Sequence, residues 1–212
     1  MSARGRFITV EGVDGAGKSS HVQFIADALR ARLEAPGAAA AHHVIVTREP
    51  GGTDLAERLR EAILAEAMAP LAETLLMFAA RCDHVQRVIE PALAAGHWVV
   101  CDRFTDATFA YQGAGKGVPL ELIERLAEAA YPGLEPDRTL LFDCSYAVSR
   151  QRLEASGKQL DRFERQDQGF FERVRNAYLS LARAEPARVR VIDAAADIDR
   201  IRRQLQQALG FE

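Results

Sequence analysis

The sequence has little that would suit an oxidising compartment or a membrane. It contains only three cysteines, Cys82, Cys101 and Cys144, whose wide spacing forms neither a CxxC pair nor a Cys/His set suited to zinc. The basic start of the chain is followed by a short apolar run that Glu11 interrupts, so no secretion signal is expected. No apolar stretch approaches the roughly 18 residues that a membrane-spanning helix needs. These absences predict a reduced, cytoplasmic protein.

An excess of charge of one sign is also missing. The 212 residues include 27 basic and 30 acidic ones, which gives a formal net charge of −3. This balance argues against a general nucleic-acid or membrane-surface binder, so an anionic substrate must be met by a local cluster of Arg and Lys. With 48% apolar residues and no visible repeat or linker, the chain is expected to fold as one domain over residues 1–212.

Short apolar runs alternate with longer segments of helical periodicity. Buried strands are predicted at Phe7–Glu11, His43–Thr47, Trp98–Asp102, Thr139–Asp143 and Val189–Asp193. Helices are predicted at Ser19–Leu33, Leu55–Glu66, Leu71–Ala94, Leu120–Ala130, Phe170–Ala184 and Ile198–Leu209, with a loop around Ala35–Ala41. This alternation predicts an α/β fold in which helices cover both faces of a parallel sheet. Ligands of such folds bind at the carboxyl ends of the strands, where Glu11, Asp102 and Asp143 lie.

The segment 150–168 differs from the helices around it. Its basic residues, among them Arg150, Arg152, Lys158 and Arg162, are mixed with acids. A helix charged on all sides suits a mobile lid better than a core element.

Residues 12–19, Gly-Val-Asp-Gly-Ala-Gly-Lys-Ser, fit the motif G-x-x-x-x-G-K-[ST] between a strand and a helix, which is the context that this P-loop motif requires. Glycines let the backbone N–H groups converge on phosphate oxygens. Lys18 would bridge the β- and γ-phosphates of a nucleotide, and the Ser19 hydroxyl would ligate Mg²⁺. The candidate ATP-binding residues are Gly12, Val13, Asp14, Gly15, Ala16, Gly17, Lys18, Ser19 and Ser20.

A P-loop alone leaves several classes of nucleotide-binding protein open. A regulatory GTPase would need an Asn-Lys-x-Asp segment, but Asn176 is the only asparagine of the chain. The only D-x-x-G match, residues 14–17, lies within the P-loop itself. A P-loop switch protein therefore stays only as a weaker alternative from a different functional class.

Four further motifs, in sequence order, are Thr47-Arg48-Glu49-Pro50-Gly51-Gly52-Thr53, Phe78-Ala79-Ala80-Arg81, Asp102-Arg103-Phe104 and Ala110-Tyr111-Gln112-Gly113. Together with the P-loop, they make the chain resemble the thymidylate kinase family of P-loop nucleoside monophosphate kinases over nearly its whole length. The resemblance implies a P-loop kinase fold with a five-stranded parallel sheet, a helical lid over about residues 150–168, and a homodimer. It also implies transfer of the γ-phosphoryl group of Mg-ATP to dTMP, with another nucleoside monophosphate kinase as the closest alternative.

The resemblance assigns charged residues to the reacting phosphates. Arg48 and Arg103 grip the dTMP phosphate through their guanidinium forks, and Asp14 contacts the sugar 3′-hydroxyl. Asp102 would hold Mg²⁺ through water, although a simple ion pair with Arg103 fits it as well. Which lid cation reaches the transferred phosphoryl stays open, because residues 153–157 replace the third arginine that the family usually has in its first lid cluster. The catalytic candidates are Lys18, Arg103, Arg152 and Arg162.

The resemblance also describes the base site. Phe78 would stack on thymine, although the apolar run around it equally suits a core position. Arg81 would donate to the base carbonyl O4, and the Tyr111 ring would exclude a 2′-hydroxyl. Thr108 and Gln112 are further candidates for contact with the base.

Overall fold

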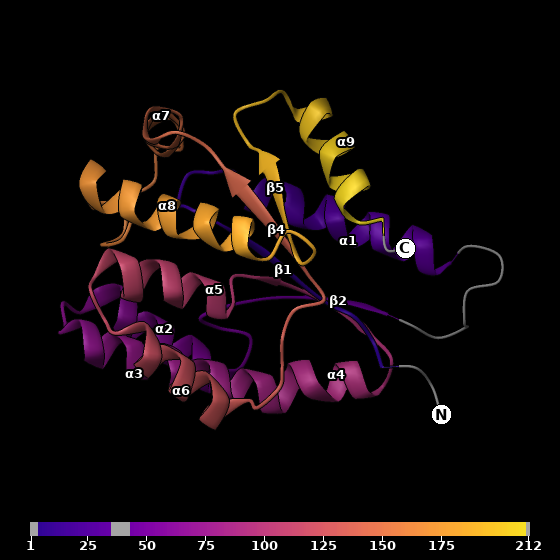
Figure 1. Cartoon of the computed structure of the whole chain (residues 1–212), viewed down its shortest axis with the longest axis horizontal. Helices are drawn as coiled ribbons and strands as arrows, with labels where there is room; N and C mark the ends of the chain where they lie inside the picture. Colours follow the sequence, from indigo (N-terminus) through magenta and orange to yellow (C-terminus); the bar gives the residue numbers. More distant parts are fainter. Residues whose placement is uncertain (1–3, 35–42, 211–212) are drawn as a thin grey trace.

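The computed structural model describes residues 4–34 and 43–210, so the predicted loop at Ala35–Ala41 lies outside the described residues (Figure 1). Five parallel strands form one sheet in the order β2-β3-β1-β4-β5. The strands are β1 (Phe7–Gly12), β2 (Val44–Arg48), β3 (Trp98–Asp102), β4 (Arg138–Asp143) and β5 (Val189–Asp193). The predicted α/β fold with a five-stranded parallel sheet is thus confirmed, and every strand bound lies within one residue of its prediction.

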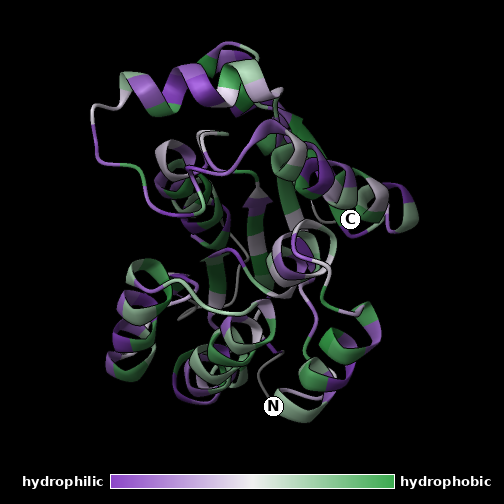
Figure 2. Ribbon diagram, turned by 90° about the vertical axis from the view of Figure 1, so that its left-hand side faces the viewer, coloured by the Kyte–Doolittle hydropathy of each residue, from purple (hydrophilic) through white to green (hydrophobic). Residues whose placement is uncertain are grey.

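Helices enclose this sheet and leave the strands buried between them (Figure 2). They are α1 (Ser19–Leu33), α2 (Asp54–Ala65), α3 (Pro70–His84), α4 (Glu90–Ala94), α5 (Thr105–Thr108), α6 (Leu120–Ala130), α7 (Tyr146–Ala155), α8 (Gln168–Ala184) and α9 (Ile198–Ala208). Two π-helical stretches, η1 (Val85–Ile89) and η2 (Phe109–Gly115), interrupt the α-helical segments. Within the described residues, no helix is long and apolar enough to cross a membrane.

Two apolar cores follow from the alternation of side chains along the strands. Ile8 and Val10 of β1 join a core with side chains of α1, α8 and α9. Phe7, which points the other way, joins a second core with side chains of α3, α4 and α6. Because both faces of the sheet are covered, all six residues of β1 are buried.

The segment predicted as one helix over Leu71–Ala94 consists of α3, η1 and α4. The π-helical stretch η1 lies just before Pro91, whose missing N–H cannot continue the ladder of α-helical hydrogen bonds. The second π-helical stretch, η2, was not predicted from periodicity. It carries Tyr111 and Gln112, and π-helical turns of this kind are frequent at functional sites.

The prediction of a helix throughout 150–168 is wrong beyond Ala155. Helix α7 ends there, and turns lead from Ser156 to the start of α8. Gly157 has a φ of +63°, and the Asp161 carboxylate accepts the backbone N–H groups of Phe163 (2.8 Å) and Glu164 (3.0 Å). A side chain that bonds its own backbone in this way competes with helix formation.

Candidate functional site

The P-loop forms the floor of a large cavity at the carboxyl end of β1. Its glycines Gly12, Gly15 and Gly17 all have positive φ angles, of +134°, +74° and +87°. A Cβ on Gly12 would lie 2.3 Å from the Phe142 carbonyl oxygen, so only glycine fits there. The cavity has a volume of about 620 Å³, and its lining includes Asp14–His21, Asp102, Arg103 and Arg152.

Lys18 is buried inside the P-loop that it belongs to. Its ammonium donates to the carbonyl oxygens of Gly12 (3.0 Å) and Val13 (3.1 Å). Burial lowers the pKa of Lys18, and the like charge of Arg103 lowers it further. The ammonium is therefore held at the cavity by weak neutral acceptors, which a phosphate oxygen can replace.

The residues that were predicted to hold Mg²⁺ line this cavity together. Ser19 opens α1, and Asp102 ends β3. The Asp102 Oδ1 atom is buried and, within the described part of the chain, has no hydrogen-bond partner. Mg²⁺ prefers such oxygen ligands, so this carboxylate and hydroxyl fit the ion. The Arg103 guanidinium turns to Asp14, so in the described residues it forms no ion pair with Asp102.

Three of the arginines in the segment 150–168 have different positions. Arg152 lines the P-loop cavity, where it donates to the carbonyl oxygens of Ala16 (3.1 Å) and Ala194 (2.7 Å). Arg150 donates to the Glu164 carbonyl oxygen (2.9 Å) and does not line the cavity. Arg162, predicted as a catalytic cation, points away from the cavity; it pairs with Glu73 at 2.5 Å and donates to the carbonyl oxygen of Ile63.

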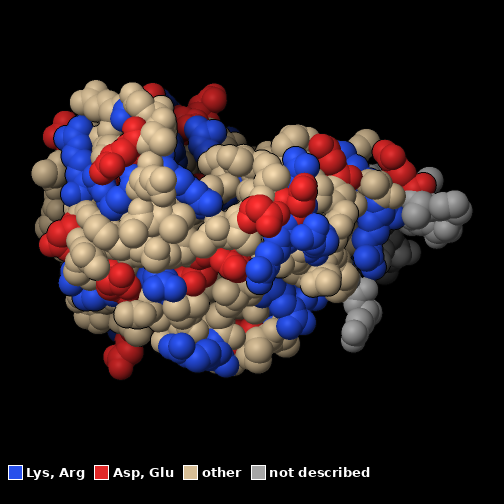
Figure 3. Space-filling view, turned by 90° about the horizontal axis from the view of Figure 1, so that it is seen from above, with Lys and Arg blue, Asp and Glu red and all other residues tan. Residues whose placement is uncertain are grey.

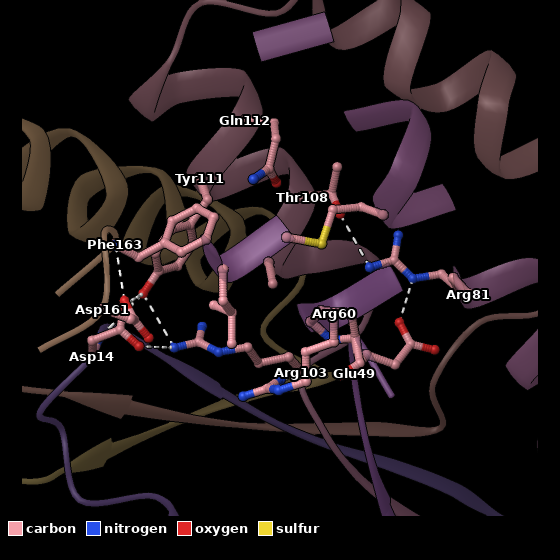
Figure 4. Close-up of a pocket in the computed structure, with 14 residues that line it drawn as sticks. Asp14, Glu49, Arg60, Arg81, Arg103, Thr108, Tyr111, Gln112, Asp161 and Phe163 are labelled. Carbon is pink, nitrogen blue, oxygen red and sulfur yellow. Dashed lines mark hydrogen bonds and ion pairs between the residues drawn. The ribbon is translucent and has the colours of Figure 1, made fainter. Parts of the chain in front are cut away.

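A second, smaller pocket adjoins the P-loop cavity, and Asp14, Arg60, Arg103 and Asp161 line both (Figure 4). Its volume is about 90 Å³. At the junction, Arg103 donates to Asp14 Oδ1 (2.6 Å) and to the Tyr111 hydroxyl (3.2 Å). That hydroxyl in turn donates to Asp14 Oδ2 (2.8 Å). These three predicted site residues therefore meet at one point.

Two properties of this junction mark it as a functional site. Arg103 has a φ of +72°, which is strained for a residue with a side chain and often accompanies function. Burial alone would raise the pKa of Asp14. The charge of Arg103, followed by that of Lys18 and the bond from Tyr111, outweighs burial and lowers this pKa below its usual value. The Asp14 carboxylate is thus kept as an anion.

Arg81 lies at the far end of the second pocket and is almost fully buried. Its guanidinium is bonded to Glu49 Oε2 (2.5 Å), the Phe104 carbonyl oxygen (3.1 Å) and the Thr108 hydroxyl (3.1 Å). Thr108 and Gln112, the further candidates for contact with the base, line the same pocket. The Glu49–Pro50 peptide bond beside it is cis.

The position of Phe78 does not agree with stacking on a base. Its ring lies in the core behind the pocket, stacked on Tyr131 at 6.2 Å between ring centroids. Met77, one residue earlier, lines the pocket instead. Successive residues of a helix point about 100° apart, so the Met77 side chain faces the pocket while the next side chain, Phe78, faces the core.

Arg48 and Arg60 also differ from the prediction. Arg48 is more than half exposed, forms an ion pair with Glu57 (2.8 Å) and does not line the pocket. Arg60, which was not predicted, lines both cavities and is half-buried. A signal was available, because Arg60 lies on the same face of α2 as the buried residues Ala56 and Ile63.

A buried acid lies beneath the junction. Glu11 accepts the Phe104 backbone N–H (2.7 Å) and the Tyr178 hydroxyl (2.7 Å). Burial, followed by the like charge of Asp106, raises the pKa of Glu11 to about 8. Glu11 is therefore largely neutral near pH 7.

One further cluster has the residue types of a metal site. Atoms of Glu49, His84 and Cys101 lie within 4.8 Å of one another. However, Glu49 is already bonded to Arg81 and to His84 Nδ1 (2.9 Å). Burial, followed by the charge of Glu49, raises the pKa of the Cys101 thiol well above its usual value. These groups are engaged with one another, so we assign no metal to them.

Comparisons with known proteins agree with this geometry. A family model described as thymidylate kinase matches residues 10–205. The chain is 53% identical over 209 residues to a thymidylate kinase of Bordetella petrii, covering 99% of this chain and 97% of that protein. It is 53% identical over 203 residues to one of Methylobacillus flagellatus, covering 95% of each. Among solved structures, a thymidylate kinase from Ehrlichia chaffeensis matches with a TM-score of 0.77 and 31% identity, covering 97% of this chain and 98% of that one.

Proposed function

The chain belongs to the thymidylate kinase family, and from this premise we propose which of its residues carry out the reaction. It has the P-loop kinase fold and transfers the γ-phosphoryl group of ATP to dTMP, giving dTDP and ADP. An oxygen of the dTMP phosphate forms the new bond to the γ-phosphorus as the bond to the β,γ-bridging oxygen breaks. The observation that carries the residue assignment is the pair of adjoining cavities, because the two phosphates must meet where these cavities join.

On the donor side, the proposed ATP-binding residues are the P-loop residues 12–20. Lys18 exchanges its carbonyl partners for phosphate oxygens and follows the charge that develops between the β- and γ-phosphates. Ser19 and Asp102 would hold Mg²⁺, which neutralises charge on the phosphates when it is bound. Arg152, which lines this cavity, is the lid cation that we assign to the transferred phosphoryl.

On the acceptor side, we assign the dTMP phosphate to Arg103 and Arg60, which line both cavities. Arg48 adds charge at the rim and must leave Glu57 to reach the phosphate. Burial, followed by the like charge of Arg48, lowers the pKa of Arg60, which shows that cations gather at this point. Asp14 and Tyr111 then lie beside the sugar.

The thymine base occupies the far end of the smaller pocket in this proposal. Arg81 donates to O4, Thr108 and Gln112 add polar contacts, and Met77 supplies an apolar wall. In this proposal, Arg162 is a structural residue of the lid and not the predicted catalytic cation. Through Glu73 it fastens the lid, residues 150–168, to α3.

We also propose that the chain is one cytoplasmic domain that acts as a homodimer. The face seen in Figure 3 carries basic and acidic side chains side by side, which gives no large surface of one sign. Four large leucines on α2, α3 and α6 are exposed: Leu55, Leu71, Leu75 and Leu120. A second copy of the chain would cover such side chains, and sedimentation of the wild type and of Leu75→Glu tests this.

The test of the substrate assignment is a coupled assay with dTMP, dUMP, dCMP and AMP, each with ATP and Mg²⁺. The methyl group of thymine is worth only about 1–3 kcal/mol, so dUMP should be a poorer but real substrate. Cytosine turns donor hydrogens toward Arg81, which can only donate, so dCMP should be rejected by about 10⁴-fold. Equal or better turnover of AMP or dCMP would instead support another nucleoside monophosphate kinase.

A further inference from the structure

A carboxylate without solvent exposure lies behind the base pocket. Glu73, in the first turn of α3, is fully buried. Lys116 donates to both of its oxygens (2.7 and 2.6 Å), and Arg162 pairs with it at 2.5 Å. Gln112 donates to it through Nε2 (2.8 Å). Two cations and an amide, from segments far apart in the sequence, thus offset the cost of burying this charge.

The chemistry of Glu73 decides which way the Gln112 amide faces. A carboxylate paired with two cations accepts hydrogen bonds and donates none. The amide must therefore present its NH₂ group to Glu73, and its carbonyl oxygen, on the other branch of the planar amide, must point away from Glu73. If the amide turned over, two acceptors would face each other in a buried site, which is costly.

Gln112 also borders the proposed base site. Gln112 lines the pocket together with Arg81 and Thr108, and its amide projects toward the pocket in Figure 4. Thymine and uracil carry a donor, N3–H, next to the O4 acceptor, whereas cytosine has an acceptor at N3. We propose that Glu73 is a positioning residue that fixes Gln112 so that its carbonyl oxygen accepts the N3–H of the base. This inference rests on the proposed function, since it places the dTMP base in this pocket.

Discrimination against cytosine then has two independent sources. Arg81, held by Glu49, tests the group at position 4, and Gln112, held by Glu73, tests position 3. Each base-contacting side chain is oriented by its own buried glutamate. Loss of Glu73 should therefore weaken the discrimination between bases at N3 while leaving the discrimination at position 4 unchanged.

The experiment measures the ratio of kcat/KM for dUMP to kcat/KM for dCMP. The variants are Glu73→Gln, Gln112→Leu and the double variant. Glu73→Gln lets the Gln112 amide turn over, so the ratio should fall by at least about tenfold. Gln112→Leu should lower the ratio by a similar factor, and Glu73→Gln should lower it no further when the amide is gone. Arg162→Gln is the matched control: it removes a cation from the same carboxylate and should slow turnover of both nucleotides while keeping the ratio.

The ratio separates positioning from a merely structural role, because partial unfolding or a loosened lid affects dUMP and dCMP alike. An unchanged ratio in Glu73→Gln, or a fall of equal size with and without the Gln112 amide, would overturn the proposal. If Glu73→Gln does not fold, Gln112→Leu alone decides, and an unchanged ratio there overturns it. If the wild-type chain failed to phosphorylate dTMP, the proposed function itself would be wrong, and this inference with it.

Discussion

The two cavities that meet at Asp14 and Arg103 are built in different ways. The P-loop cavity has a volume of about 620 Å³. Among the described residues, its cations Lys18 and Arg152 are bonded only to backbone carbonyl oxygens, and Asp102 Oδ1 has no hydrogen-bond partner. The acceptor pocket measures about 90 Å³, and its polar side chains are already held by one another or by buried acids. In the proposed assignment, the donor side therefore offers charge to a nucleoside triphosphate with its metal, whereas the acceptor side is organised in advance for the base and the sugar of dTMP.

The lid contributes to this difference. Asp161 and Phe163, from the turns after α7, line the acceptor pocket. The Phe163 ring packs edge-on to Tyr111 (6.1 Å) and lies beneath the charges of Lys116 (4.6 Å) and Arg162 (4.4 Å). The lid thus lines the acceptor pocket through Asp161 and Phe163 and lines the donor cavity through Lys158, Asp161 and Glu164.

The largest expected effect lies on the donor side. Lys18→Ala removes the only P-loop ammonium that can follow charge from the β- to the γ-phosphate, so kcat should fall at least about 100-fold. The fold should persist, which circular dichroism and thermal unfolding would check. Because dTMP binds in the other cavity, its Kd measured by calorimetry should change little. A folded Lys18→Ala protein with normal turnover would contradict the assignment of the donor cavity.

Binding of the dTMP phosphate should depend more on Arg103 and Arg60, which line both cavities, than on Arg48. Arg103→Ala and Arg60→Ala should each weaken dTMP binding by about 10- to 100-fold, because each removes a charge-assisted bond. Arg48→Ala, whose guanidinium is turned to Glu57, is the matched comparison and should cost less. Titrations with dTMP and, separately, with ATP decide the point. A larger loss of ATP affinity than of dTMP affinity would assign these arginines to the donor side.

The sequence predicted the parts of both cavities that depend on local rules. The P-loop, the strand ends and Asp102 were located because glycine requirements and strand-to-helix order act over a few residues. The turns after Ala155 were missed because the Asp161 side chain bonds its own backbone there. Arg48 and Arg162 were misplaced because the acids that hold them, Glu57 and Glu73, are brought to them only by the tertiary fold.

Met77 and Phe78 are neighbours in the sequence, but one lines the acceptor pocket and the other lies in the core. Met77→Ala should raise the KM for dTMP by about tenfold, the order expected when a few methylene-sized contacts to the base are lost, with little effect on stability. Phe78→Leu should leave the KM for dTMP almost unchanged. It should lower the free energy of unfolding by about 1–3 kcal/mol, because it leaves a gap beside Tyr131. Steady-state kinetics and denaturant unfolding of both variants check this. A raised KM confined to Phe78→Leu would return the stacking role to the aromatic ring.

The smallest expected effect on catalysis concerns Glu11, which lines neither cavity and should act on stability alone. Its pKa is raised to about 8, so between roughly pH 5 and pH 8 the folded chain holds a proton that the unfolded chain has lost. Stability must then decrease as pH rises through this range, by up to about 1.4 kcal/mol per pH unit from this group, and level off above it. Glu11→Gln keeps the shape of the side chain but cannot titrate, so the difference in unfolding free energy between variant and wild type should grow from pH 5 to pH 8. Urea unfolding across this range measures it, with the exposed Glu61→Gln as control. Parallel curves for wild type and Glu11→Gln would show that Glu11 is ionised in the folded chain.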